Sequence, residues 1–216
     1  MRTEKEFLEY LNTIKQMAAE EGYDSLDETY VNHVRARFFG EDVVAARSGR
    51  ILLREIQMTD LEAFYGFSDA ECEPVLKAFL KETRKETEEH LKSYIDTFYP
   101  LNDYGFWTIL DAEHGEIIGI CGLGQVELEN EDDSQNVVTD IGYYIRPESR
   151  HQGYAMEAVG LALEYAKDYL ELSEVYALVE EGNVPSENLL KKAGFLPYDA
   201  VKEKLGTRKI MHYTIK

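Results

Sequence analysis

The segment from Asp140 to Phe195 constrains the fold of this chain most. Residues 140–146 predict a buried strand, 147–152 a short loop, and Gly153 the start of a long helix. Residues 175–180 predict a second strand, and a second helix follows that ends near Ala193. Strand, helix and strand in this order form a βαβ crossover, whose two strands are parallel and whose connection is right-handed. The segment therefore predicts an α/β domain.

The loop that leads into the long helix reads Arg150-His151-Gln152-Gly153-Tyr154-Ala155. A glycine lets the backbone approach a ligand closely, and the amides of a helix's first turn have no partner within the helix. These amides and the positive end of the helix dipole favour a phosphate group, and an arginine adds a formal charge. By itself such a loop is equally compatible with a tight turn that binds nothing.

A second motif follows at a fixed distance, Asn183-Val-Pro-Ser186 and then Lys192-Ala-Gly194-Phe195. Together with Arg-x-x-Gly-x-Ala, it resembles the acetyl-CoA-binding segments of the GNAT N-acetyltransferases, in particular the branch of RimJ/RimL type. The resemblance runs from about residue 50 to the end of the chain. It implies a GNAT fold, in which two parallel strands of a mixed sheet splay apart and hold the pantetheine arm of acetyl-CoA between them.

The resemblance also implies which residues bind acetyl-CoA. Backbone contacts are expected from Tyr144, Ile145 and Arg146, and phosphate contacts from each residue of the loop Arg150, His151, Gln152, Gly153, Tyr154 and Ala155. Asn183 corresponds to the family's asparagine that contacts the cofactor arm, and Ser186 lies beside it. Asn183 is equally suited to cap the helix that follows, and the two roles are compatible.

For the reaction, the resemblance implies direct attack of an amine on the thioester without an acyl-enzyme. Many GNAT enzymes donate a proton from a tyrosine four residues before the Gly-Phe pair, but this chain has Leu190 there. Ser186 is the substitute candidate, either as a hydrogen-bond donor to the sulfur or simply as the start of a helix. Neither cysteine, Cys72 or Cys121, has basic neighbours in the sequence that would activate a thiol. No metal-ligand pattern is present, so no metal is expected.

An acidic run of Glu127, Glu129, Glu131, Asp132 and Asp133 precedes Asp140. Its default interpretation is a solvated loop between strands. In the family this strand end borders the acceptor side of the cleft, so Glu127 and Glu129 are candidates to attract a cationic amine and to take its proton.

The net charge of −19 argues against non-specific binding to nucleic acid or to an anionic membrane surface. The N-terminus lacks the apolar run of a signal peptide, and no stretch is long enough to span a membrane. We therefore expect a cytoplasmic protein. The pattern leaves a homodimer open.

Residues 1–46 predict a helical N-terminal extension, and 47–216 predict the GNAT domain. Apolar residues at helical spacing begin at Phe7, and Gly22 ends that pattern. Ser25-Leu-Asp-Glu28 has the form of a capping box that opens a second helix, which Gly40 stops. His33 is interpreted as an ordinary surface residue of that helix. The extension is expected to pack on the host domain, with a partner-binding arm or a lid as the alternative.

The remaining elements complete the prediction. Residues 81–99 predict a helix that ends before Pro100, residues 105–123 a hairpin with His114 at its tip, and 196–215 a closing hairpin. The predicted function is acetyl transfer from acetyl-CoA to a primary amine, with a protein or peptide N-terminal α-amino group as the first candidate. A small cationic amine, such as a polyamine or an antibiotic-like molecule, is the alternative acceptor. A non-catalytic acetyl-CoA-binding protein is the alternative from another class.

Overall fold

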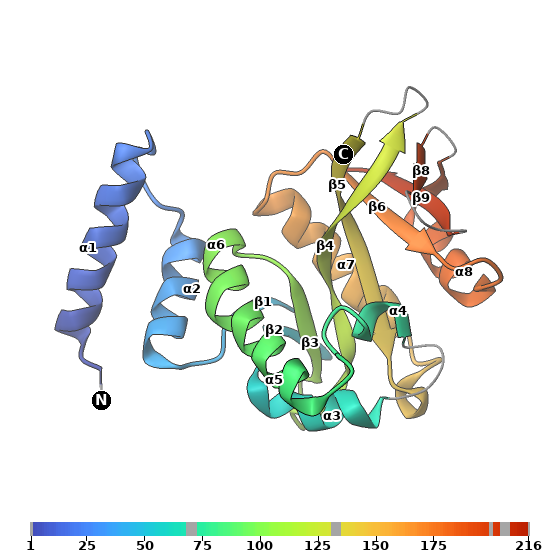
Figure 1. Ribbon diagram of the computed structural model, residues 1–216, viewed down its shortest axis with the longest axis horizontal. Helices are drawn as coiled ribbons and strands as arrows, with labels where there is room; N and C mark the ends of the chain where they lie inside the picture. The colour runs from blue at the N-terminus through green and yellow to red at the C-terminus, as the bar shows by residue number, and fades with distance from the viewer. Residues whose placement is uncertain (1, 68–72, 131–134, 199–200, 204–207, 216) are drawn as a thin grey trace.

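The computed structural model describes residues 2–67, 73–130, 135–198, 201–203 and 208–215 (Figure 1). Its helices are α1 Glu4–Glu20, α2 Glu28–Phe39, α3 Leu61–Gly66, α4 Glu73–Leu76, α5 Arg84–Ser93, α6 Tyr99–Asn102, α7 Tyr154–Asp168 and α8 Val184–Ala193. Its strands are β1 Val44–Arg47, β2 Ile51–Glu55, β3 Phe106–Asp111, β4 Ile117–Asn130, β5 Gln135–Ile145, β6 Glu174–Val179, β7 Leu196–Pro197, β8 Val201–Glu203 and β9 Lys209–Thr214.

The strands form one mixed sheet in the order β1-β2-β3-β4-β5-β6-β9-β7, and β8 pairs with β4. Strands β1 to β5 are antiparallel neighbours, β5 and β6 are parallel, and β6 is antiparallel to β9. The predicted α/β class with a mixed sheet is confirmed. The closing hairpin is corrected in part: β7 pairs with β9 as expected, whereas β8 leaves the hairpin and pairs with β4.

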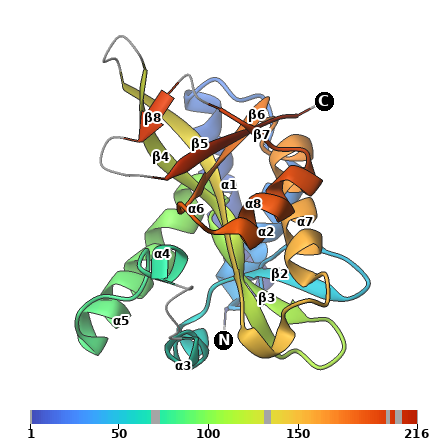
Figure 2. The same ribbon diagram turned by 90° about the vertical axis from the view of Figure 1, so that its right-hand side faces the viewer.

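Helices cover both faces of this sheet. In Figure 2, α7 and α8 lie on one side of β4 and β5, and α3, α4 and α5 lie on the other. Helix α7 packs closely because the residues on its inner face are small, and Ala158, Ala162 and Ala166 are fully buried. The helix begins after Gly153 as predicted and ends at Asp168, close to the expected end. This packing fixes the start of α7 at the end of β5.

The acidic run differs from its default interpretation. Residues 124–130 continue β4, and β5 starts at Gln135, five residues before the predicted strand. Register pairs such as Val126↔Val138 and Glu127↔Val137 show that the two strands remain paired along this extension. Glu127 and Glu129 therefore lie in a strand and not in a loop, whereas Glu131, Asp132 and Asp133 lie outside the described residues.

The predicted end of a helix before Pro100 is also wrong. The chain stays helical from Arg84 to Asn102, with a wider π-helical turn at Tyr94–Phe98. Across that turn the amide of Tyr99 donates to the carbonyl of Tyr94, five residues back. Proline breaks a regular helix because it lacks an N–H and its ring clashes with the carbonyl four residues earlier. The wide turn and the new start at Tyr99 place Pro100 in a first turn, where proline is tolerated.

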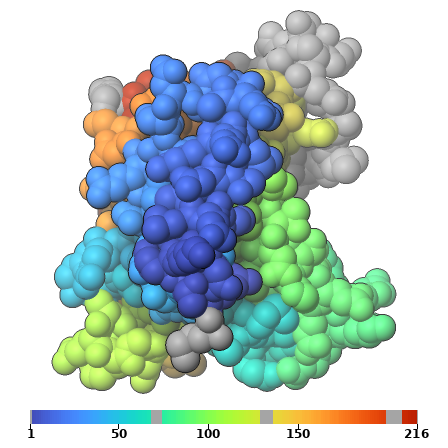
Figure 3. Space-filling view, turned by 90° about the vertical axis from the view of Figure 1, so that its left-hand side faces the viewer, coloured from blue at the N-terminus to red at the C-terminus, as the bar shows by residue number. Residues whose placement is uncertain are grey.

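The N-terminal extension covers the centre of the face of the molecule seen in Figure 3, with α1 packed on α2. Phe7, Leu11 and Val34 form its small core. Helix α2 ends at Gly40 as predicted, but its N-cap is Asp27 and not Ser25, because the Asp27 carboxylate accepts from the amides of Thr29 and Tyr30. The division at residue 46 stays a prediction, and β1 includes residues on both sides of it.

A buried polar cluster attaches α2 to the rest of the fold. The carboxylate of Asp103 accepts from His33 Nδ1 at 2.8 Å and from Arg37 Nη2 at 2.5 Å. Arg37 also bonds Glu55 of β2, and Tyr165 of α7 donates to the carbonyl of Asp103 at 2.5 Å. His33 is only 5% exposed, so its interpretation as a surface residue is wrong. The sequence did not reveal this, since the partner of His33 lies 70 residues away.

We expect Asp103→Asn to lower the free energy of unfolding by about 1–3 kcal/mol, because the buried carboxylate accepts hydrogen bonds from His33 and Arg37 that an amide group replaces only in part. Asparagine keeps the preference for the left-handed backbone of Asp103, whose φ is 54°, so the change isolates the charge. Urea unfolding measures the effect. Asp24→Asn, at an exposed position of the α1–α2 connection, serves as the control and should change stability by no more than about 0.5 kcal/mol. Equal stability of the two variants would contradict the assignment.

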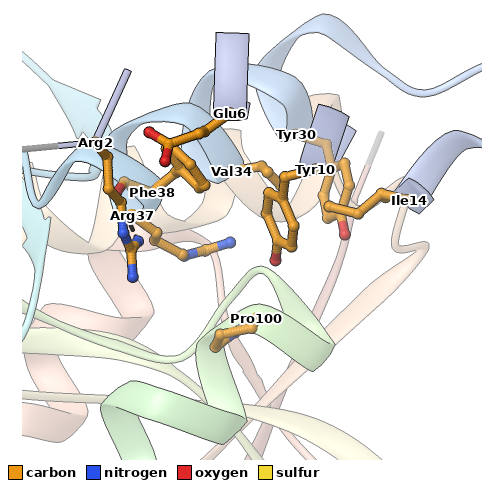
Figure 4. A pocket seen from close by; sticks show the side chains of 9 residues that line it. All are labelled: Arg2, Glu6, Tyr10, Ile14, Tyr30, Val34, Arg37, Phe38 and Pro100. Carbon is orange, nitrogen blue, oxygen red and sulfur yellow. Dashed lines mark hydrogen bonds between the residues drawn. The ribbon is translucent and has the colours of Figure 1, made fainter. Parts of the chain in front are cut away.

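A cavity of about 530 Å³ lies between the extension and α6 (Figure 4). It is lined by Arg2, Glu6, Tyr10, Ile14, Tyr30, Val34, Arg37, Phe38 and Pro100. None of these residues belongs to β5, β6 or the loop before α7, so the cavity is separate from the predicted acetyl-CoA site.

Candidate active site

The loop before α7 has the geometry that the sequence predicted. Gly153 is the N-cap of α7 with a φ of +86°, and no side chain caps the first helical turn. Gln152, Tyr154 and Ala155 flank this glycine, and His151 is exposed with a φ of 60°. A β-carbon at Gly153 would have one neighbour within 4 Å, Arg50 Nη2 at 3.6 Å. The first turn thus lacks a side-chain cap at the positive end of a helix 15 residues long, beside open space at Gly153.

Arg50 contacts this loop from a distant part of the chain, and the sequence did not predict it as a site residue. It lies immediately before β2, and its Nη1 donates to the carbonyl of Gln152 at 3.1 Å. Its guanidinium lies 4.9 Å from the ring centre of Tyr154 and is paired with Glu157 of α7. More than 100 residues separate Arg50 from these partners, so no local pattern could have identified it.

The end of β5 is held by its own loop. Arg150 Nε donates to the carbonyl of Ile145 at 2.9 Å, and the guanidinium lies 5.3 Å from the ring centre of Tyr144. The amide of Arg146 donates to Ile118 and its carbonyl accepts from Ser149. A backbone contact from the Arg146 amide to a ligand would therefore require the bond to Ile118 to open.

Strands β5 and β6 separate at the place where the resemblance implied an opening. Among the described residues their ladder has one aligned pair, Asp140↔Tyr176. Beyond it, β5 continues to Ile145 beside β4, and β6 continues to Val179 beside β9. Beyond this pair the side of β5 that faces β6 has no strand ladder. Ile145 lies at this edge with its carbonyl accepting from Arg150, whereas the backbone of Tyr144 pairs with Ile120 of β4.

Helix α8 starts on the other side of the opening. The side chain of Asn183 accepts from the amide of Ser186 at 3.2 Å, so Asn183 acts as the N-cap. The hydroxyl of Tyr143 on β5 lies 2.8 Å from Ser186 Oγ, which joins β5 to the first turn of α8. Burial raises the pKa of Tyr143 to about 12, although the hydrogen bond with Ser186 acts in the opposite direction. Leu190 is buried, as expected for an apolar residue on the inner face of α8.

Asp140 is the carboxylate nearest to the point of separation. It lies on the sheet face opposite α7, because a β-carbon at Gly124 would lie 2.8 Å from Asp140 Oδ1 and 3.4 Å from the Phe106 ring. A β-carbon at Gly142 would meet Phe106 and Val75 of α4 on the same face. Burial raises the pKa of Asp140 to about 6, partly offset by the charge of Arg208. The sequence contained a signal for it: a carboxylate opening an otherwise apolar strand.

Glu127 and Glu129, the candidate carboxylates that the sequence predicted, lie on β4 and not on β5. Side chains alternate along a strand, and Val126 and Leu128 face the same side as Val138. Glu127 therefore points to the face opposite Asp140, where its partner Val137 is 58% exposed. For Glu129 only the backbone is described, paired with Gln135 and Lys202. The structure thus separates Glu127 from the face that carries Asp140.

Nucleophilic catalysis by Cys121 has no support in its surroundings. The thiol is fully buried, and burial raises its pKa to about 12. A thiol reacts as its thiolate, so this environment suppresses reactivity. Cys72 lies outside the described residues. In the part of the chain that the structure describes, no three His, Cys, Asp or Glu side chains converge to hold a metal ion.

These residues fit acetyl-CoA. The uncapped amides after Gly153, with Arg50 and Arg150 nearby, suit a pyrophosphate. The edge of β5 that does not pair with β6 suits the extended pantetheine arm, because backbone groups there can form hydrogen bonds with its amides. When bound, acetyl-CoA would supply an activated acyl group as a thioester.

Comparison with known proteins agrees with this geometry. The sequence family described as the acetyltransferase (GNAT) domain matches residues 50–196. The chain therefore belongs to the GNAT family of acetyltransferases, enzymes that use acetyl-CoA as the acetyl donor. It is 31% identical over 150 residues to the uncharacterized N-acetyltransferase YoaA of Bacillus subtilis, covering 68% of this chain and 79% of YoaA. With YkkB of the same organism, 31% identity extends over 48% of that protein, about half its length.

Solved structures share the fold at low sequence identity. A RimL ribosomal L7/L12 α-N-protein acetyltransferase has a TM-score of 0.60 at 13% identity, over 81% of this chain and 96% of that one. A spermidine/spermine N-acetyltransferase SpeG from Vibrio cholerae, in mutant form, has a TM-score of 0.57 at 20% identity, over 76% and 94%. At these identities the two likenesses concern the fold alone.

Within the described residues, no helix has the length and apolar character needed to cross a lipid bilayer.

Proposed function

We propose that this chain transfers the acetyl group of acetyl-CoA to a primary amine by direct attack, with Asp140 as the acceptor of the amine proton. The observation that carries this proposal is the place of Asp140, a half-buried carboxylate where β5 and β6 separate. A general base works best when its pKa lies near the working pH, and burial brings the pKa of Asp140 to about 6. Asp140 takes the role that the sequence analysis gave to Glu127 and Glu129.

For the acceptor we favour the N-terminal α-amino group of a protein or peptide, as in the RimJ/RimL-like branch. Neighbouring acidic side chains already have partners: Glu174 pairs with His212 at 3.0 Å, and Glu180 lies 3.9 Å from Arg208. The surroundings of Asp140 are otherwise rich in apolar and aromatic groups, such as Phe106, Val75 and Tyr176. This arrangement suits a single positive charge on a largely neutral body better than a polyamine with several charges.

Proton transfer favours the same acceptor. An α-amino group has a pKa of about 7.7–8, whereas an alkylamine such as lysine has about 10.4. A base whose pKa is about 6 removes a proton from the former with a smaller energetic penalty. A polyamine or antibiotic-like amine remains the second candidate, supported by the fold shared with SpeG.

The test is release of CoA from acetyl-CoA in the presence of a peptide library and a panel of polyamines. We expect amine-dependent release, fastest with peptides that have a free α-amino group. The control is the same peptides blocked at the N-terminus but carrying a lysine. Raised salt should reduce the rate only modestly, because screening acts mainly on exposed charges. Preference for a polyamine would overturn the acceptor, and no amine-dependent release would favour the non-catalytic alternative.

A further inference from the structure

The opening between β5 and β6 is spanned by a pair of hydroxyl groups. Tyr143 projects from β5, and its hydroxyl lies 2.8 Å from Ser186 Oγ in the first turn of α8. The same hydroxyl is 3.4 Å from the carbonyl oxygen of Ser186, a longer contact. Both side chains are half-buried, so each is shielded from water yet borders the opening. The pair therefore lies where a ligand threaded between β5 and β6 would pass.

The pair supplies one hydrogen that is not used within it. Two hydroxyls have two hydrogens, and their mutual bond uses one. Tyr143 is protonated at neutral pH, as an ordinary tyrosine is, and burial raises its pKa further, to about 12. If Tyr143 donates to Ser186 Oγ, the serine hydrogen is free to point toward the opening. The Asn183 cap fixes the Ser186 backbone at the same time, which limits where this hydrogen can point.

We propose that Tyr143 is a positioning residue, which bonds Ser186 Oγ and directs the Ser186 hydroxyl to the sulfur of the departing CoA. The inference rests on the proposed acetyl transfer and assigns a role to a side chain that the reaction has so far left unused. In the transfer, the bond from the amine nitrogen to the acetyl carbon forms and the carbon–sulfur bond breaks. The electron pair of that bond goes to sulfur. The ammonium group first passes one proton to Asp140, and the neutral amine that attacks loses its second proton to the departing sulfur, so CoA leaves as the thiol. The sulfur, which gains negative charge, accepts a hydrogen bond from Ser186.

Such a bond is stronger in the transition state than before it, because charge on the sulfur develops as the bond breaks. We therefore expect Tyr143→Phe and Ser186→Ala each to lower kcat about 10- to 100-fold, with little change in the KM for acetyl-CoA. Because Tyr143 acts through Ser186, Tyr143→Phe should have no further effect on kcat when Ser186 is already alanine.

A direct readout is the pKa of the CoA thiol when it is bound to the protein, followed by the ultraviolet absorbance of the thiolate. A donated hydrogen bond stabilises the thiolate, so the wild-type protein should lower this pKa relative to free CoA. Both variants should return it toward the free value. The matched control is Tyr165→Phe, which removes another tyrosine hydroxyl bond, to the Asp103 carbonyl at 2.5 Å, in the polar cluster that attaches α2. Because this hydroxyl bonds Asp103 and not Ser186, the change should leave the pKa of bound CoA unchanged.

The outcomes separate the two proposals. If CoA does not bind, or no amine releases it from acetyl-CoA, the proposed function fails. If transfer occurs and Tyr143→Phe changes neither kcat nor the pKa of bound CoA, the role of Tyr143 is overturned while the function stands. If Tyr143→Phe lowers kcat further in the Ser186→Ala background, Tyr143 acts on the sulfur itself and not through Ser186.

Discussion

Replacing Gly153 by glutamate should abolish binding of acetyl-CoA. The substitution places a side chain where the backbone of the N-cap faces open space, beside the amides that suit a pyrophosphate. It also places a carboxylate next to the phosphate groups. This carboxylate repels them and cancels part of the positive potential at the start of the helix. Finally, a residue with a β-carbon is strained at a φ of +86°. We expect no binding in calorimetry. The loss in affinity should be at least about 100-fold, because like charges repel and the new side chain blocks the approach of the pyrophosphate.

Gly22→Glu is the matched control for this experiment. Gly22 also has a positive φ, +94°, a β-carbon there would have no neighbour within 4 Å, and the residue lies at the end of α1. The control therefore has the same residue change and a similar backbone penalty without a nearby binding loop. It should bind acetyl-CoA like the wild-type protein. Unchanged affinity in a folded Gly153→Glu protein would show that the loop does not hold the pyrophosphate.

Asp140→Asn should lower kcat by about 100- to 10,000-fold, the usual range for loss of a general base. Asparagine keeps the shape of the side chain and removes its ability to accept a proton. In the wild-type protein the carboxylate must be ionised, so activity should rise with pH through about 6 and fall below it. The variant should lose this limb of the pH profile. Steady-state kinetics between acidic and neutral pH measures both effects.

The contribution of Asp140 to stability should change with pH in the opposite direction to the activity. The folded-state pKa of Asp140 lies above the ordinary value, so its contribution to stability is greatest at low pH and declines as pH rises through about 6. Removing the charge should therefore not destabilise the protein at pH 7. Glu127→Gln discriminates between the two assignments. If it, and not Asp140→Asn, removes the acidic limb, the carboxylate on the opposite face is the base and Asp140 is not.

The sequence by itself determined the local elements and the class of protein. The turn at Gly153, the small inner face of α7 and the Asn183 cap depend on residues close together in the chain, where glycine permissiveness, helical periodicity and capping act. These segments also carry the family motif. A pattern confined to about 50 residues therefore indicated both the fold and the acetyl-CoA loop.

Only the tertiary structure decided which side chains meet. The register of β4 against β5 separates Glu127 from Asp140, since a shift of one residue moves a side chain to the opposite face of a sheet. Arg50 reaches the loop before α7, and His33 meets Asp103, across 102 and 70 residues of chain. Tyr143 and Ser186 meet because β5 and β6 separate and α8 starts beside the gap. These contacts depend on strand pairing and layer packing, which act between distant segments and leave no periodic signal in the sequence.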